Sequence, residues 1–172
     1  RSQATNNLKQ LGIAMHNFHD SHKRFPGSVK DENGKPLLSW RVQLLPFLEQ
    51  QNLFAQFHMD EPWDSPHNKL LIQRIPPPFT APGSKAGGGK TNYVGFRHEN
   101  AIFADKGRMG FRDILDGTSN TIMIVEADDD HAVIWTKPDD LKFDEKKPLA
   151  GLGEIRKGGF LAAMCDGAVH FI

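Results

Sequence analysis

The sequence predicts an α+β fold in which helices come first and a mainly antiparallel sheet follows. Three observations predict it: helical apolar spacing in residues 4–22, a proline- and glycine-rich stretch at 76–90, and short β-type runs after that stretch. We expect a single domain over residues 1–172. It would consist of a helical part (1–75), a Pro/Gly-rich seam (76–90) and a strand-rich part (91–172).

The first helix is predicted by one apolar stripe. At about 100° per residue, six side chains fall on one side: Ala4, Leu8, Leu11, Met15, Phe18 and His22. The polar side chains point elsewhere: Asn6, Asn7, Lys9, Gln10, Asn17 and Asp20. Phe25-Pro26-Gly27 ends the helix, because proline disfavours helical geometry in the residue before it. Ile13 lies about 180° from the stripe and would be a contact point for neighbouring subunits.

Short helices are expected between the first helix and the seam. After a polar turn region at 28–36, residues 37–57 have helical spacing, with Ser39 as the N-cap. Pro46 should break this segment into two short helices. Asp64-Ser65-Pro66 is typical of a further helix start. The buried side of that helix would consist of Leu70, Leu71 and Ile75.

The strand-rich part contains several β-type runs and one hairpin. The runs are 93–96, 101–104, 121–126 and 132–136. Residues 160–165 and 168–172 flank Asp166-Gly167, which is the favoured turn of a two-residue β-hairpin. These runs predict the sheet that covers the apolar stripe of the first helix.

Composition argues against nucleic acid as a partner. Lysine and arginine together number 21, as do aspartate and glutamate, so no excess charge would steer nucleic acid. Cys165 is the only cysteine, which rules out an intrachain disulfide. No apolar run approaches the roughly 18 residues of a membrane-spanning helix, so membrane contact would need a segment upstream of Arg1. The chain starts without Met and almost directly in a helix, so we expect it to be an excised piece.

A carboxylate cluster is the candidate metal site. Hard ligands gather at the end of one predicted strand: Glu126, Asp128, Asp129, Asp130 and His131. Asp139 and Asp140 could approach the cluster across the sheet. Loop carboxylates are what Ca²⁺ requires, so Asp128, Asp129 and Asp130 are the candidate Ca²⁺ ligands. The EF-hand spacing is missing, however, and a solvated turn is the alternative.

Other motifs favour structural roles over chemistry. His16, His19 and Asp20 have a zinc-ligand spacing, but histidines beside an apolar stripe usually cap the edge of a core. Residues 83–91 are similar to a P-loop with the first glycine misplaced by one residue, and a surface loop is favoured instead. Cys165 lacks a basic neighbour that would activate it, and Ser119 is a turn hydroxyl. We therefore expect no enzyme and no cofactor other than Ca²⁺.

Ordered motifs along nearly the whole chain carry a family resemblance. They are Asn6-Asn7-Leu8-Lys9-Gln10-Leu11-Gly12, His16-Asn17-Phe18-His19-Asp20, Ser39-Trp40-Arg41-Val42, Leu45-Pro46-Phe47-Leu48-Glu49-Gln50, Glu61-Pro62-Trp63-Asp64-Ser65-Pro66-His67-Asn68, Thr91-Asn92-Tyr93-Val94, Asp116-Gly117-Thr118-Ser119-Asn120-Thr121-Ile122, Trp135-Thr136-Lys137-Pro138-Asp139-Asp140-Leu141, Gly158-Gly159-Phe160, Asp166-Gly167 and Phe171-Ile172. Together they resemble the planctomycete family called domain of unknown function 1559, also labelled bacterial solute-binding family 10.

The resemblance implies a cell-envelope protein. Members typically begin with a prepilin-type segment, an apolar helix that continues into the first helix of this chain. This implies a pilin-like or pseudopilin-like fold, a cell-envelope or extracellular location, and a non-enzymatic structural or assembly role. Protein subunits would be partners through the N-terminal helix. A small-solute or Ca²⁺-binding module is the alternative function.

Three positions depart from the family pattern. Arg156 stands where relatives have a histidine ten residues before Asp166. Ala4 and Ala81 stand where relatives often have cysteines, and the resemblance implies that those cysteines pair, tying the helix to the seam. The loss of this tie leaves room for a cytoplasmic paralogue.

Overall fold

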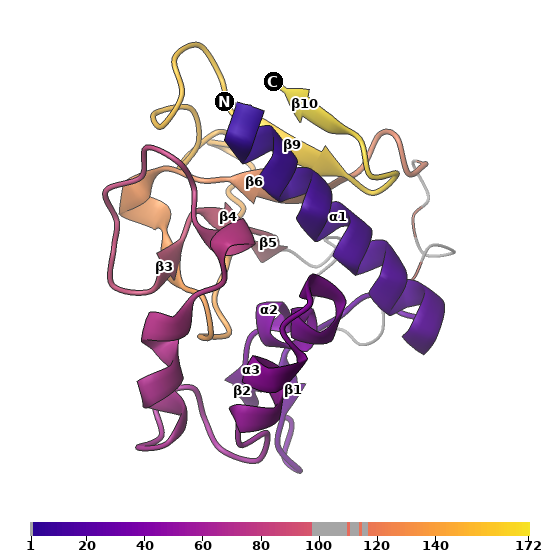
Figure 1. Cartoon of the computed structure of the whole chain (residues 1–172). Helices are drawn as coiled ribbons and strands as arrows, with labels where there is room; N and C mark the ends of the chain where they lie inside the picture. The colour runs from indigo at the N-terminus through magenta and orange to yellow at the C-terminus, as the bar shows by residue number, and fades with distance from the viewer. Residues whose placement is uncertain (1, 98–109, 111–113, 115–116) are drawn as a thin grey trace.

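A helix that lies across a sheet forms the centre of the structure. The computed structural model describes residues 2–97, 110, 114 and 117–172. Helix α1 (Ser2–His22) contacts a four-stranded sheet with the strand order β10-β9-β6-β4 (Figure 1). The strands are β4 (Tyr93–Val94), β6 (Ile122–Glu126), β9 (Leu161–Met164) and β10 (Val169–Phe171), and each neighbouring pair is antiparallel. The α+β class, with a long N-terminal helix and an antiparallel sheet, is therefore confirmed.

The buried face of α1 is wider than the predicted stripe. Five of the six stripe residues are buried, and the exposed His22 stacks its ring on Phe18 at 4.0 Å. Asn7 was expected to point away from the core, and this is wrong: it is 3% exposed, and its Nδ2 donates to the Thr80 carbonyl oxygen at 3.0 Å. The reason is that α1 contacts η3 (Pro77–Phe79) as well as the sheet. None of the described helices combines the length and apolarity needed to span a bilayer.

Both faces of the sheet are buried. On β6, Ile124 belongs to the large core that α1 covers, whereas its neighbour Val125 belongs to a smaller core on the other face. Ala163 and Ala162 on β9 divide between the two cores in the same way. This is the two-residue alternation of side chains along a strand. The central strands are apolar at consecutive positions because both faces need apolar cover.

Three two-stranded pairs surround the main sheet. β1 (Val29–Lys30) and β2 (Pro36–Leu38) form a hairpin where a polar turn was expected. β3 (Lys90–Thr91) pairs with β7 (Val133–Ile134), and β5 (Phe96–Arg97) pairs with β8 (Leu141–Lys142) in parallel. The predicted run 93–96 is thus divided between β4 and β5, and 132–136 contributes two strand residues outside the main sheet. The predicted run 101–104 lies outside the described residues.

The C-terminal hairpin is confirmed, but its loop is longer than predicted. The Met164 N–H donates to the Ala168 carbonyl oxygen, and the Gly167 N–H donates to the Met164 carbonyl oxygen. The loop therefore has three residues, Cys165, Asp166 and Gly167, instead of two. Gly167 has φ +90°, the left-handed conformation that such loops require at their last position. The Asp166 side chain also accepts from the Ala168 N–H at 2.9 Å.

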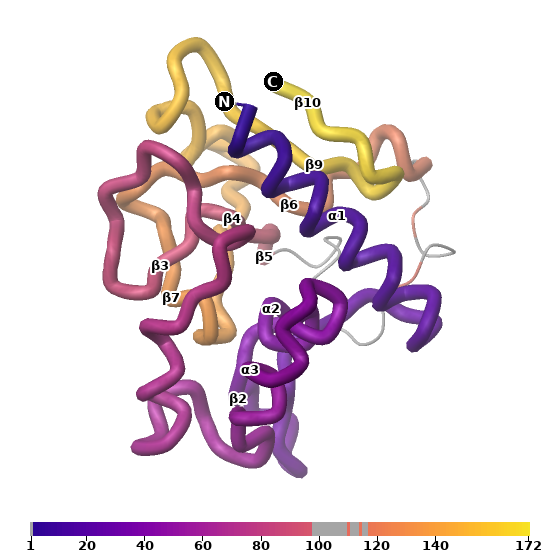
Figure 2. The backbone as a smooth tube through the Cα atoms, in the orientation of Figure 1, coloured from indigo at the N-terminus to yellow at the C-terminus, as the bar shows by residue number. Residues whose placement is uncertain are grey.

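The short helices before the seam follow local capping rules. Ser39 caps α2 (Trp40–Gln43) by accepting the Arg41 N–H, as predicted. The break at Pro46 is also confirmed, because η1 (Leu45–Leu48) separates α2 from α3 (Gln51–Gln56). Figure 2 follows the chain from these helices through the seam, drawn in magenta, into β3.

The last helical segment differs from its prediction. η2 (Asn68–Arg74) is a 3₁₀ helix, and the Ser65 hydroxyl accepts the Asn68 N–H at its start. Leu70 was expected to be buried but is 74% exposed, and the predicted buried side is wrong at this position. Leu71 is buried as predicted, Ile75 is partly buried, and Ile72 is buried as well. The tighter 3₁₀ turn rotates successive side chains by about 120°, so the α-helical spacing used in the prediction does not apply.

A buried ion pair joins the helical part to the strand-rich part. The Arg41 side chain is fully buried, and its Nη2 lies 2.7 Å from Asp140 Oδ1. The same guanidinium donates to the carbonyl oxygens of Tyr93 and Asp139, each at 3.1 Å. Asp140 also accepts from the Gly95 N–H at 2.8 Å and from the Trp40 indole at 3.2 Å. The pair is therefore hydrogen-bonded on both sides, which offsets part of the desolvation of its charges. Burial still lowers the pKa of Arg41 and raises the pKa of Asp140.

We predict that Asp140→Ala strongly destabilises the fold. The substitution leaves the Arg41 guanidinium buried without its counter-charge, which should lower the free energy of unfolding by about 3–5 kcal/mol. Urea denaturation measures this change. Asp139→Ala is the matched control, because the Asp139 side chain is partly exposed and pairs with Arg97 at 3.5 Å. Its effect should stay within about 1 kcal/mol, and equal losses in the two variants would contradict the role of the buried pair.

Candidate functional site

The candidate Ca²⁺ ligands lie where β6 ends, and two of them already hold neighbouring backbone. Asp128 is buried, and its Oδ1 accepts the Glu154 N–H at 2.7 Å. Asp129 and Asp130 belong to the short helix η5 (Asp129–His131), and Asp130 is exposed. The three carboxylates therefore face different surroundings. The Ca²⁺ site stays a prediction.

Asp129 closes the glycine-rich end of the seam. Its carboxylate accepts from the Ser84 hydroxyl at 2.6 Å, the Lys85 N–H at 3.0 Å and the Asn92 amide at 2.9 Å. These hydrogen bonds, led by the one from Ser84, hold the pKa of Asp129 below its usual value. Asp129 thus fixes the loop onto β3 and the strand end, a role that a carboxylate can fill without a metal ion.

The other acidic residues of the predicted cluster each bind a different basic partner. Asp140 pairs with Arg41, Asp139 lies beside Arg97 and Lys137, and Glu126 pairs with Arg156. Across the described ranges 2–97, 110, 114 and 117–172, no three His, Cys, Asp or Glu side chains are grouped to hold a metal ion. The prediction that Asp139 and Asp140 approach the cluster across the sheet is therefore wrong.

The loop similar to a P-loop has a different structural context. It follows the 3₁₀ turn η3 and leads into β3, whereas a P-loop follows a strand and begins a helix. Gly87, Gly88 and Gly89 all have positive φ, and a Cβ on Gly89 would overlap Ile72. The glycines are therefore needed for the backbone path and its close packing. This matches the surface-loop interpretation.

The remaining candidate residues make structural contacts. His16 bonds the Cys165 carbonyl oxygen at 2.7 Å, while the His19 ring packs against Phe25 at 5.0 Å. Burial lowers the pKa of His19. Burial also raises the pKa of the Cys165 thiol to about 12, so the thiol stays protonated at neutral pH. Ser119 is exposed in a turn.

Arg156 anchors a polar cluster under α1. Its Nε and Nη2 donate to the two oxygens of the buried Glu126 carboxylate at 2.9 and 3.1 Å, and Nη2 also donates to Pro82 O at 2.7 Å. The hydrogen bond to Glu126 raises the pKa of Arg156. Tyr93 connects the cluster to α1, because its hydroxyl accepts from Asn7 at 3.5 Å. Burial raises the pKa of Tyr93, so its hydroxyl stays protonated.

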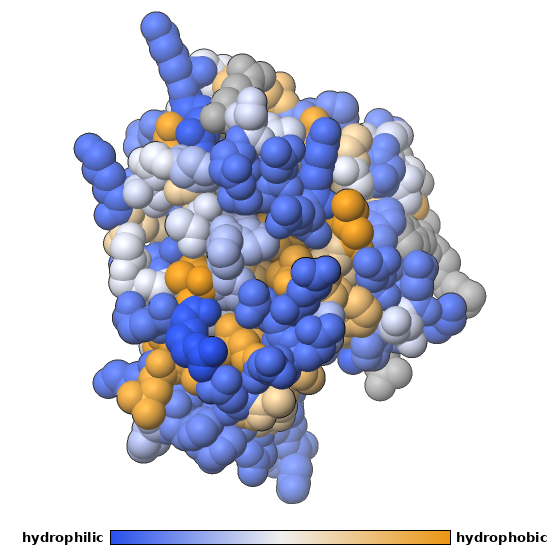
Figure 3. All heavy atoms as spheres, in the orientation of Figure 1, coloured by the Kyte–Doolittle hydropathy of each residue, from blue (hydrophilic) through white to orange (hydrophobic). Residues whose placement is uncertain are grey.

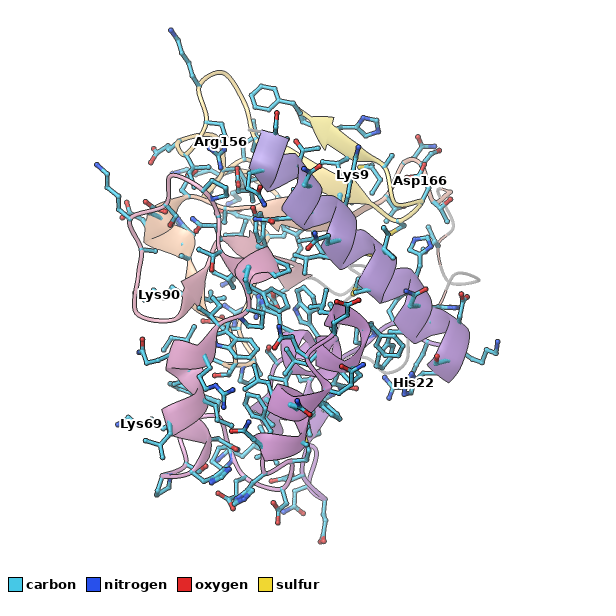
Figure 4. All side chains as sticks on the ribbon, in the orientation of Figure 1. Lys9, His22, Lys69, Lys90, Arg156 and Asp166 are labelled. Carbon is cyan, nitrogen blue, oxygen red and sulfur yellow. The ribbon has the colours of Figure 1, made fainter. Side chains whose placement is uncertain are left out.

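Sequence reasoning missed this cluster because its members are far apart in the chain. The one signal in the sequence was Arg156, which stands where the resemblance led us to expect a histidine. Figure 4 labels Arg156 beside the first turns of α1. The cluster joins α1, the seam and β6, so its arrangement favours a structural role over a reaction.

The outer face of α1 is the candidate interaction surface. Ile13 is 62% exposed, as expected for a residue opposite the stripe. The polar residues that share this face are exposed as well: Asn6, Lys9, Gln10, Asn17 and Asp20. Figure 3 shows a mostly hydrophilic surface with small apolar patches on this side of the molecule. This face of α1 is accessible to another protein, although one exposed isoleucine among polar residues is normal for a protein surface.

We predict that Asp129→Asn weakens the seam loop and flattens the acid dependence of stability. An amide places an N–H₂ group against donors that need an acceptor, which should lower the unfolding free energy at pH 7 by about 1–2 kcal/mol. Because the folded pKa of Asp129 is depressed, the stability it adds is present above its unfolded pKa of about 3.9. That stability is lost as pH falls through the lower folded value. Urea titrations at several pH values measure both effects.

Asp130→Asn is the control for this prediction. Asp130 is exposed on the same short helix, so the substitution should change the stability little. If Asp130→Asn and Asp129→Asn lowered the unfolding free energy equally and gave the same pH profile, the effect of Asp129 would come from its charge alone. The prediction that its hydrogen bonds stabilise the seam loop would then be wrong.

We predict that Ala4→Cys with Ala81→Cys forms a helix-to-seam disulfide under oxidising conditions. Both alanines are buried in the same core, and Asn7, one turn after Ala4, bonds the carbonyl oxygen of Thr80. An oxidised bond over such a long loop should stabilise the chain by about 2–4 kcal/mol. Thiol titration and thermal unfolding with and without reductant measure this. The single variant Ala4→Cys should show no such difference, and free thiols persisting in the oxidised double variant would contradict the prediction.

Comparison with known proteins gives one finding. The sequence model of a family described as "Protein of unknown function (DUF1559)", short name SBP_bac_10, matches residues 1–149. No curated protein and no solved structure is significantly similar to the chain. The match covers most of the 172 residues, and the chain therefore belongs to the DUF1559 family.

Proposed function

We propose that the chain is a pilin-like or pseudopilin-like module with a structural or assembly role at the cell envelope. The observation that supports it is the way in which α1 packs against the rest of the fold. One face of this 21-residue helix is buried against the antiparallel sheet and η3, and the opposite face is exposed along its length. A helix held in this way offers neighbouring subunits a rigid and regular surface.

The proposal includes an anchor upstream of Arg1. An apolar helix that continued directly into α1 would hold the module at the membrane and leave the sheet on the outside. In this arrangement Ile13 and the polar residues around it face neighbouring subunits. The buried or partly buried charged residues fit a structural role. Arg41 pairs with Asp140 and Arg156 pairs with Glu126, and both arginines also donate to backbone carbonyl oxygens.

We predict that the coding sequence immediately upstream of Arg1 encodes about 20 apolar residues preceded by a short basic leader. Reading those codons, followed by membrane fractionation and mass spectrometry of the mature N-terminus, tests this. The full-length protein should fractionate with membranes, whereas the chain from Arg1 should not. A hydrophilic domain upstream would overturn the pilin-like proposal and leave the solute- or Ca²⁺-binding alternative.

A further inference from the structure

We propose that a hollow in the seam binds a small apolar α-amino acid as a zwitterion. This hollow, the seam hollow, is lined by the end of η2, by the glycine-rich end of the seam and by the start of β3. A ligand site here goes beyond the proposed assembly role and does not depend on it.

The seam hollow has the size of a small-molecule site. Its volume is about 300 Å³, at the lower end of the range of ligand pockets. Residues 87–89 line it without side chains, and a Cβ on Gly87 or Gly88 would meet no other atom within 4 Å. Ile75 and Ala81 add apolar surface to the lining. The hollow therefore suits an occupant of few atoms with a small apolar side chain.

Asn92 supplies a buried acceptor that no described protein group uses. The residue lines the seam hollow and is 1% exposed. Its amide nitrogen donates to Ala127 O and to Asp129 Oδ1, both at 2.9 Å, which fixes the orientation of the amide group. The amide oxygen has no hydrogen-bond partner among the residues that the structure describes. A buried acceptor without a donor is costly, so a ligand that brings an N–H or O–H group to it gains affinity.

The geometry of the amide places the oxygen of Asn92 toward the hollow. Ala127 and Asp129, which hold the amide nitrogen, do not line the hollow. The oxygen lies on the opposite side of the same planar group, at the wall of the hollow. The Asp129 carboxylate also polarises the amide, which makes the oxygen a stronger acceptor and favours a cationic donor. An ammonium group is such a donor.

Lys90 supplies the opposite charge at the same hollow. It is the first residue of β3, where Figure 4 labels it, and it is exposed. It lines the hollow and makes no ion pair with any residue that the structure describes. The seam hollow thus offers an acceptor for an ammonium group and a cation for a carboxylate. A free α-amino acid carries these two groups on one carbon atom.

Thermal unfolding of the 172-residue chain with added ligands tests the inference. At about 10 mM, L-alanine or L-valine should raise the unfolding midpoint, because a ligand that binds only the folded chain stabilises it. Alaninamide lacks the carboxylate and N-acetylalanine lacks the ammonium group. Both should therefore raise the midpoint much less than L-alanine does.

Two further measurements locate the site. In NMR spectra of the amide groups, L-alanine should shift the side-chain amide of Asn92 and the backbone amides of residues 87–89. Lys90→Met should weaken binding at least tenfold, because it removes the partner of the carboxylate. Lys85→Met is the matched control, since Lys85 is exposed in the same seam but does not line the hollow, and it should bind like the unmodified chain. Circular dichroism checks that both variants keep the fold.

Several outcomes would overturn the inference. They are an unchanged midpoint with both amino acids, a raised midpoint without a shift at Asn92, equal rises with L-alanine and alaninamide, and equal binding by Lys90→Met and the unmodified chain. A midpoint raised by Ca²⁺ but by neither amino acid would overturn it as well and would support the Ca²⁺ alternative. The codons upstream of Arg1 decide the proposed assembly role independently of these results.

Discussion

The buried pair of Arg41 and Asp140 is the constraint on which the two parts of the chain depend. Arg41 belongs to the first short helix, and Asp140 lies almost 100 residues later. A charged group that is fully buried must keep its partner, because the alternative is an unpaired charge in a low-dielectric interior. Hydrogen bonds from Ser39 to Trp135 O and from the Ser39 N–H to Thr136 O fix the same contact nearby. The relative position of helical part and strand-rich part is thereby defined.

Tyr93 connects this pair to the helix that lies on the sheet. Its carbonyl oxygen accepts from Arg41, and its hydroxyl accepts from Asn7 on α1. Arg156 and Glu126 stabilise the other side of the same region through their own partly buried pair. Two polar clusters therefore meet at one strand, beneath an otherwise apolar contact. This arrangement orients α1 more sharply than an apolar stripe alone could, because hydrogen bonds depend on direction.

These contacts explain what several residues of the family motifs do in the fold. Asn7, Trp40, Arg41, Tyr93 and Asp140 all lie in motif segments, and each bonds a residue distant in the chain. These bonds hold the fold together and leave the outer surface of α1 exposed. The proposed assembly role uses that surface, whose residues can vary without loss of the core.

The sequence by itself determined the features that depend on near neighbours. The stripe of α1, the Ser39 cap, the break at Pro46 and the Asp166-Gly167 turn all follow from spacing and local backbone preference, which act within a few residues. Only the tertiary structure decided that Asn7 is buried, that Asp140 pairs with Arg41 and that Arg156 reaches Glu126. Burial and charge pairing depend on which distant segments meet, and periodicity carries no information about that meeting. For the same reason, a row of aspartates read as one cluster is divided among different partners in the folded chain.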